Sequence, residues 1–136
     1  MIKKELLSDF KYFDLNNQKL IIWKSFDRLE ESLSGGTDFD LLLVQGDGEI
    51  LLGLLEERGW TKFIAEKWRR FRNIHDYFKV FLDEEGKSVI IHFHVHEVVR
   101  TGQRFTKSLE INNELFMDQL TIKNGFETVR EGFDLE

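Results

Sequence analysis

The chain has 136 residues and a formal net charge of −6 at pH 7, with 41% hydrophobic and 32% charged residues. This composition predicts a soluble globular protein, and the length suits a single domain over residues 1–136. The absence of cysteine excludes disulfides and thiolate metal sites, and the acidic balance argues against general nucleic-acid binding. No apolar stretch approaches the ~20 residues that span a bilayer, and the N-terminus lacks a signal-peptide core, so we expect a cytoplasmic protein without membrane contact.

Apolar spacing predicts alternating helices and strands in the first part of the chain. Ser25 is a suitable N-cap and Gly35 a suitable C-cap for a short helix between two apolar runs. In chain order we expect a helix over 2–13, a strand over 20–23, a helix over 26–34, a strand over 37–44 and a helix over 49–58.

The second part of the chain is richer in strand patterns. Residues 84–87 form a turn signal between two alternating runs, which predicts a hairpin. We expect strands over 60–66, 77–83 and 88–99, a helix over 113–124 capped by Gly125, and a strand or ordered tail over 126–129. The order predicts an α/β or α+β domain, in which helices pack on a mixed β-sheet.

Asp38 and Asp40 are the only charges in an apolar strand that follows a glycine turn. Alternate strand residues face the same way, so both carboxylates project from one side of the sheet. Two like charges on one face repel each other, and a divalent cation relieves that repulsion and can hold a phosphate. The alternative is that these aspartates cap the turn at the start of the strand.

A later strand carries His92, His94 and His96 on one face, with Phe93 and Val95 on the other. Imidazoles are ligands for Zn²⁺ and similar ions. Three neighbours along one strand rarely converge on one tetrahedral ion, so one histidine acting with Asp38 and Asp40 is the sharper hypothesis. A row of half-exposed histidines hydrogen-bonded to their neighbours remains the structural alternative.

Lys24-Ser25 ends one strand, a short helix follows, and Asp38-Phe39-Asp40 opens the next strand. This arrangement resembles the nucleotidyltransferase superfamily of the DNA polymerase β type. It is most similar to the nucleotidyltransferase-like domains that accompany bacterial surface-polysaccharide glycosyltransferases. There a Lys-Ser turn, a Gly-x-(Ser/Thr)-Asp-x-Asp strand, a His-rich strand and a segment like residues 100–107 occur in the same order. The resemblance covers roughly residues 20–44 and 88–125.

The resemblance implies a minimal nucleotidyltransferase fold and transfer of a nucleotidyl group from a nucleoside triphosphate to a hydroxyl of a sugar, small molecule or protein. It assigns phosphate binding to Lys24, Ser25 and Gly36, and Mg²⁺, or else Mn²⁺ or Zn²⁺, to Asp38 and Asp40. His94, with His92 as second choice, stands where the family has a third acid, as a ligand or general base. Two departures from the family are Lys24, where glycine is usual, and this histidine.

Two other functions stay open on the sequence. One is a degenerate nucleotide- or partner-binding module, alone or beside a partner domain or protein, which the missing third acid supports. The other is a metal-binding protein centred on the histidine strand. The basic run over residues 67–72, with interleaved aromatics, is either a substrate contact or a solvated face.

Overall fold

The computed structural model describes residues 2–24, 26–63, 74–97, 99–101, 109–111, 117 and 119–129. Three α-helices are present in this part of the chain: α1 (Ile2–Leu15), α2 (Leu29–Leu33) and α3 (Gly48–Glu57), with a 3₁₀ turn, η1 (Phe26–Arg28), leading into α2. None of them is long and apolar enough to cross a lipid bilayer. Asp47 caps α3, because its side chain accepts hydrogen bonds from the backbone N–H groups of Glu49 and Ile50.

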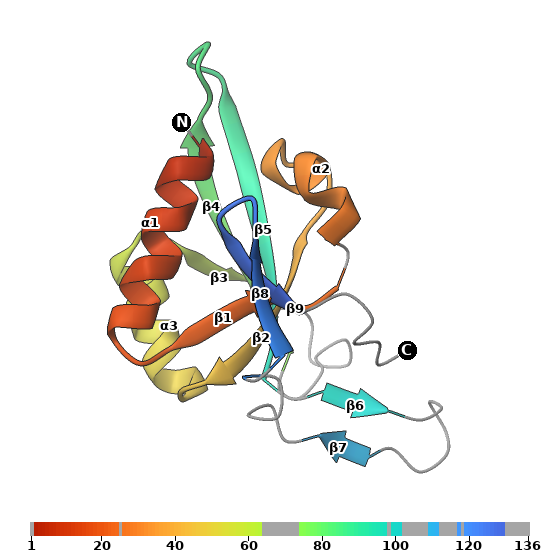
Figure 1. The fold of residues 1–136 in the computed structure, drawn as a ribbon. Coiled ribbons are helices and arrows are strands. Elements are labelled where there is room, and N and C mark those ends of the chain that lie inside the picture. Colours follow the sequence, from red (N-terminus) through yellow and green to blue (C-terminus); the bar gives the residue numbers. More distant parts are fainter. Residues whose placement is uncertain are drawn as a thin grey trace.

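Seven strands form one mixed sheet in the order β3-β4-β5-β2-β1-β9-β8 (Figure 1). They are β1 (Lys19–Ile22), β2 (Phe39–Gln45), β3 (Thr61–Phe63), β4 (Ile74–Leu82), β5 (Ser88–His96), β8 (Leu120–Lys123) and β9 (Phe126–Val129). The pairs β2–β5 and β1–β9 are parallel, and the other neighbours are antiparallel. A separate antiparallel pair contains β6 (Val99–Thr101) and β7 (Leu109–Ile111). The predicted α+β class, helices on a mixed sheet, is confirmed.

Alternation along the strands divides the sheet into two different faces. One face packs against α1 and α3 and carries the main core, including the fully buried rings of Phe13, Phe39 and Phe93. The other face carries a smaller apolar cluster of Ile21, Leu42 and Val44, on which Trp23, Met117, Leu120 and Val129 pack. The same face carries the polar side chains of Asp40 on β2, of Asp76 on β4, and of His92, His94 and His96 on β5, and they form the site described below.

A buried carboxylate joins α1 to the rest of the core. Asp9 is 1% exposed, and its two oxygens accept hydrogen bonds from Arg58 Nε at 2.8 Å, Trp60 Nε1 at 3.0 Å and Lys79 Nζ at 2.8 Å. These donors come from the end of α3, the loop after it, and β4. A buried charge that has several strong partners holds these elements in one arrangement.

The predicted helix over 113–124 is wrong over residues 120–124, whereas residues 117 and 119 are in 3₁₀ conformation. Leu120–Lys123 is strand β8, which pairs with β9 across a tight turn at Asn124 and Gly125. Both turn residues have positive φ, 53° and 88°, as a two-residue type I′ hairpin turn requires. The prediction treated Gly125 as a helix cap, whereas Asn-Gly between two apolar runs is a hairpin signal. Residues 113–116 and 118 lie outside the described residues.

Other boundaries differ in ways that bear on the site. The strand predicted over 77–83 begins earlier, at Ile74, so Asp76 is part of the sheet. The strand predicted over 88–99 ends at His96, and residues 99–101 pair in the separate small sheet. The predicted helix over 26–34 begins as the 3₁₀ turn η1, and residues 64–66 of the strand predicted over 60–66 lie outside the described residues.

Candidate metal centre

The second face of the sheet gathers carboxylates and imidazoles from three adjacent strands. Asp40 of β2 is in register with His94 of β5, and His94 is in register with Asp76 of β4. His94 therefore has a carboxylate on each neighbouring strand. Asp38 lies just before β2, and its carbonyl oxygen accepts a hydrogen bond from Ser32 Oγ at 2.9 Å, which ties the start of β2 to α2.

Asp76 binds two of the histidines through one oxygen. Its Oδ1 accepts hydrogen bonds from His92 Nε2 at 2.7 Å and from His94 Nδ1 at 2.8 Å. These bonds hold the pKa of Asp76 well below its usual range, and the bond to Asp76 raises the pKa of His94 above 6.5. Because Nδ1 of His94 donates to Asp76, its Nε2 is the nitrogen left to coordinate an ion.

His96 lies where the polar face meets the apolar cluster. It is in register with Leu42, and its ring contacts those of Trp23 and His94, with centroids 5.1 Å and 4.7 Å away. Burial lowers the pKa of His96 to about 4, and the charges of His94 and Lys24 act in the same direction. Its Nε2 and the Nε1 of Trp23 are buried without a hydrogen-bond partner among the residues that the structure describes.

Two groups of side chains on this face could hold a metal ion. One contains Asp38, His92 and His94, and the other contains Asp40, His94 and His96; within each group the ligand atoms lie within 4.8 Å of one another. Ligands about 2.0–2.2 Å from one ion need separations of this order or slightly less, so small side-chain movements would close either group. Both groups use His94, which makes them two overlapping positions in one centre.

The structure thus brings together four of the predicted site residues, Asp38, Asp40, His92 and His94. The predicted phosphate contacts are less closely assembled. Lys24 is exposed, with its Nζ 4.9 Å from the centre of the Trp23 ring. The N–H of Gly36 donates to the carbonyl of Glu31 at 2.8 Å, so it already has a partner at the end of α2. Ser25 and the basic run over 67–72 lie outside the described residues.

Asp76 is the site residue that the sequence analysis missed, because the strand was predicted to begin at Tyr77. The hairpin register contained the signal. Leu82 pairs with Ser88 across the turn, and continuing this antiparallel register places Asp76 opposite His94. A polar residue at that position, facing the histidines, would have extended the predicted site by one carboxylate.

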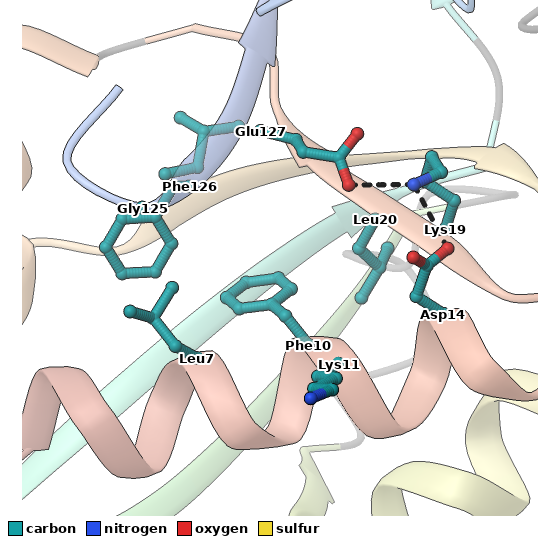
Figure 2. A pocket seen from close by; sticks show the side chains of 10 residues that line it. Leu7, Phe10, Lys11, Asp14, Lys19, Leu20, Gly125, Phe126 and Glu127 are labelled. Carbon is teal, nitrogen blue, oxygen red and sulfur yellow. Dashed lines mark hydrogen bonds and ion pairs between the residues drawn. The ribbon is translucent and has the colours of Figure 1, made fainter. Parts of the chain in front are cut away.

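Two cavities lie on the opposite side of the sheet. The first, about 290 Å³, opens between α1, β1 and β9 (Figure 2) and has apolar walls that include Leu7, Phe10 and Phe126. Lys19 at its rim pairs with Asp14 at 3.0 Å and Glu127 at 2.7 Å, as the dashed lines in Figure 2 mark. Its walls and paired rim charges suit an apolar molecule better than a phosphate.

The second cavity, about 600 Å³, lies at the start of α3 and is lined by Asp47, Gly48, Glu49, Leu52, Lys62, His75, Tyr77 and Glu97. His75 and Glu97 form a hydrogen-bonded pair there. Burial, followed by the charges of Glu97 and Glu56, raises the pKa of Tyr77 to about 12. Tyr77 is therefore a neutral hydroxyl at physiological pH.

Comparisons with known proteins leave the function open. No family model and no curated protein matches the chain. It is similar to a solved structure described as the crystal structure of JHP933 from Helicobacter pylori, with a TM-score of 0.48 and 9% sequence identity. The match covers 96% of this chain and 51% of that chain, so the chain spans about half the length of that protein.

Proposed function

We propose that this chain is a metal-dependent nucleotidyltransferase, whose catalytic ion is bound by carboxylates of β2 and by His94. The observation that supports this most strongly is the register that places Asp40 and Asp76 on either side of His94. Asp38 and Asp40 supply negative charge, one at each of the two overlapping positions, His94 supplies a ligand nitrogen to both, and Asp76 fixes the orientation of His94. In this arrangement Asp38, Asp40 and His94 are ligands, and Asp76 positions His94.

In nucleotidyl transfer a protein contributes mainly by positioning the reactants and by stabilising charge on the phosphates. A bound divalent ion would neutralise the α-phosphate and lower the pKa of the attacking hydroxyl. The hydroxyl oxygen forms a bond to the α-phosphorus, and the bond to pyrophosphate breaks. The carboxylates of Asp38 and Asp40 would hold the ion beneath the phosphates, and the exposed Lys24, whose charge acts on His96, would contact the phosphate tail.

The missing third acid has a counterpart in this arrangement. The sequence predicts a histidine where the resembled family has an acid, and Asp76 of the neighbouring strand β4 places a negative charge beside that histidine by accepting a 2.8 Å hydrogen bond from its Nδ1. A histidine paired with a carboxylate is a stronger ligand than a histidine alone. We therefore favour a working centre over a degenerate binding module.

A second candidate, metal binding without nucleotide chemistry, is favoured by one observation. Both ligand groups contain two histidines and a single carboxylate, a donor set that binds transition ions without help from a phosphate. The phosphate contact predicted at Gly36 is also weakened by the hydrogen bond of its N–H to Glu31. Nucleotide binding separates this candidate from the leading proposal.

The test is calorimetric titration of ATP, GTP, CTP and UTP, with and without Mg²⁺, Mn²⁺ or Zn²⁺, followed by assays of pyrophosphate release with sugar, small-molecule and protein hydroxyl acceptors. We expect at least one triphosphate to bind only with a divalent ion, and pyrophosphate release to disappear in Asp38→Asn and Asp40→Asn. Asp83→Asn, in the remote hairpin turn, is the matched control. Ion binding without any triphosphate binding would favour the second candidate and overturn the first.

A further inference from the structure

We propose that the centre selects a first-row transition ion such as Zn²⁺ over Mg²⁺, and that the ion binds at the inner position formed by Asp40, His94 and His96. Mg²⁺ prefers an octahedral shell of oxygen ligands and gives up water reluctantly, whereas Zn²⁺ and Co²⁺ accept imidazole nitrogen in shells of four or five ligands. Two imidazoles and one carboxylate within 4.8 Å of one another match the second preference.

Existing contacts favour this inner position over the outer position, which is formed by Asp38, His92 and His94. His92, which belongs to the outer group, already donates Nε2 to Asp76 and stacks on Phe78, with ring centres 4.3 Å apart and planes at 20°. His96, which belongs to the inner group, has a buried Nε2 without a partner in the described part of the chain. Leaving a buried polar atom unsatisfied is unfavourable, so an ion that binds His96 satisfies an atom without a partner, whereas Nε2 of His92 is already satisfied by Asp76.

Asp76 orients His94 for coordination at the same position. The carboxylate of Asp76 accepts the Nδ1 proton, which leaves Nε2 as the coordinating atom and holds the ring in place. A histidine that donates its second nitrogen to a carboxylate is a recurring feature of metal centres. Asp76 is therefore a positioning residue in this account, acting on the ion through His94.

The surroundings of His96 also favour a tightly bound ion. Leu42 lies beside it in the sheet register, and Trp23 covers it edge to face, at an angle of 74° between the rings. Both belong to or pack on the apolar cluster of this face. Apolar cover excludes water and strengthens the attraction between an ion and its ligands. The inference rests on the proposed function for what the ion does, and on these contacts for which ion binds.

The experiment measures metal affinity in the full chain without nucleotide. Zn²⁺ affinity is measured by competition with a chromophoric chelator, Mg²⁺ affinity by calorimetry, and the ligand set by the visible d–d absorption of bound Co²⁺. We expect Zn²⁺ to bind far more tightly than Mg²⁺, and His96→Gln to weaken Zn²⁺ binding by ~100-fold or more. His75→Gln, a substitution on the opposite face of the sheet, is the control and should leave the affinity unchanged.

His92→Gln distinguishes the two positions. Retained Zn²⁺ binding in His92→Gln, with loss in His96→Gln, supports the inner position; the reverse pattern overturns it. Equal affinities for Mg²⁺ and Zn²⁺ overturn the proposed selectivity. Circular dichroism of each metal-free variant checks that it is folded.

A measurement on the unaltered chain keeps the test independent of variant folding. Bound Co²⁺ is expected to broaden or shift the NMR signals of His96 and of the Trp23 indole, while the Trp60 indole, stacked on Phe93 in the main core, is little affected. Unchanged Trp23 and His96 signals at saturating Co²⁺ would contradict the inner position. Zn²⁺ binding at this position without pyrophosphate release would leave this inference standing and reject only the proposed function.

Discussion

His94 donates its Nδ1 proton to Oδ1 of Asp76 across the β4–β5 pairing, at 2.8 Å. Through this bond a carboxylate two strands away from β2 leaves Nε2 as the nitrogen of His94 that can coordinate an ion. The centre is thus built from three strands, and its geometry depends on the register of the β4–β5 hairpin as well as on the Asp38/Asp40 pair.

Removing the charge of Asp76 should weaken ion binding while leaving the ligands in place. We expect Asp76→Asn to lower Zn²⁺ affinity by about 10–100-fold, the usual effect of losing a carboxylate behind a ligand histidine. Chelator competition measures the change, with Asp83→Asn as a control for a general loss of negative charge. An affinity equal to that of the unaltered chain would show that Asp76 does not position His94.

The pKa values of His94 and His96 should lie on opposite sides of 6.5, the ordinary value for imidazole. The hydrogen bond that His94 donates to Asp76 raises the pKa of His94, and burial lowers the pKa of His96 to about 4. NMR titration of the metal-free protein, following the imidazole carbon-bound protons, measures both midpoints. A shared midpoint near 6.5 would contradict the described environments.

These shifts have opposite effects on stability. His94 binds its proton more strongly in the folded state, so its contribution is complete below pH 6.5 and is lost as the pH rises through its raised pKa. His96 resists protonation when folded, so its environment reduces stability as the pH falls from 6.5 towards 4. In His96→Gln, the free energy of unfolding should therefore fall less steeply over that acidic range than in the unaltered chain.

Much of the fold follows from apolar periodicity, because the alternation in β2 and β5 directly determines which residues face the core. The sequence analysis predicted both strands, and the structure places Phe39 and Phe93 in the core and Asp40 and His94 on the other face. Strand β8 was mistaken for the end of a helix because short apolar segments fit either period. The pairing of β8 with β9, and positive φ at both Asn124 and Gly125, distinguish the turn from a helix end.

The turn that was misassigned provides a stability test. Gly125 has φ +88°, and a Cβ placed on it would lie 3.1 Å from Leu7 Cδ1, whereas Gly86 has φ +81° with no other atom within 4 Å. We expect Gly125→Ala to destabilise the fold by about 1–3 kcal/mol from backbone strain and crowding, and Gly86→Ala by less. Urea unfolding of both variants measures the difference. A neutral Gly125→Ala would contradict the described turn.

The buried Asp9 should contribute far more to stability than an exposed aspartate on the same helix. Asp9→Ala leaves Arg58, Trp60 and Lys79 without their shared acceptor, and we expect a loss on the order of 3 kcal/mol. Asp14→Ala, which removes a half-exposed partner of Lys19, should cost at most ~1 kcal/mol. Similar unfolding midpoints for the two variants would contradict the role of Asp9 in joining α1 to the core.

Only part of the candidate centre could be predicted, because a local sequence pattern marks some of its residues and not others. Asp38, Asp40 and His94 stand out because they are polar residues in apolar strands. Asp76 follows a polar segment, and its strand was predicted to begin one residue later, so no local pattern singled it out. The role of His96 depends on the cover given by Trp23, a contact between β5 and the end of β1 that is distant in sequence.

The most direct measurement is calorimetric titration of inorganic triphosphate, which carries no base, into the protein with and without Zn²⁺ or Mn²⁺, alongside Asp40→Asn. Our account predicts that triphosphate binds only when the ion is present and that Asp40→Asn abolishes this binding. Triphosphate binding of equal strength without an ion, or unchanged in Asp40→Asn, would contradict a phosphate site built on this centre.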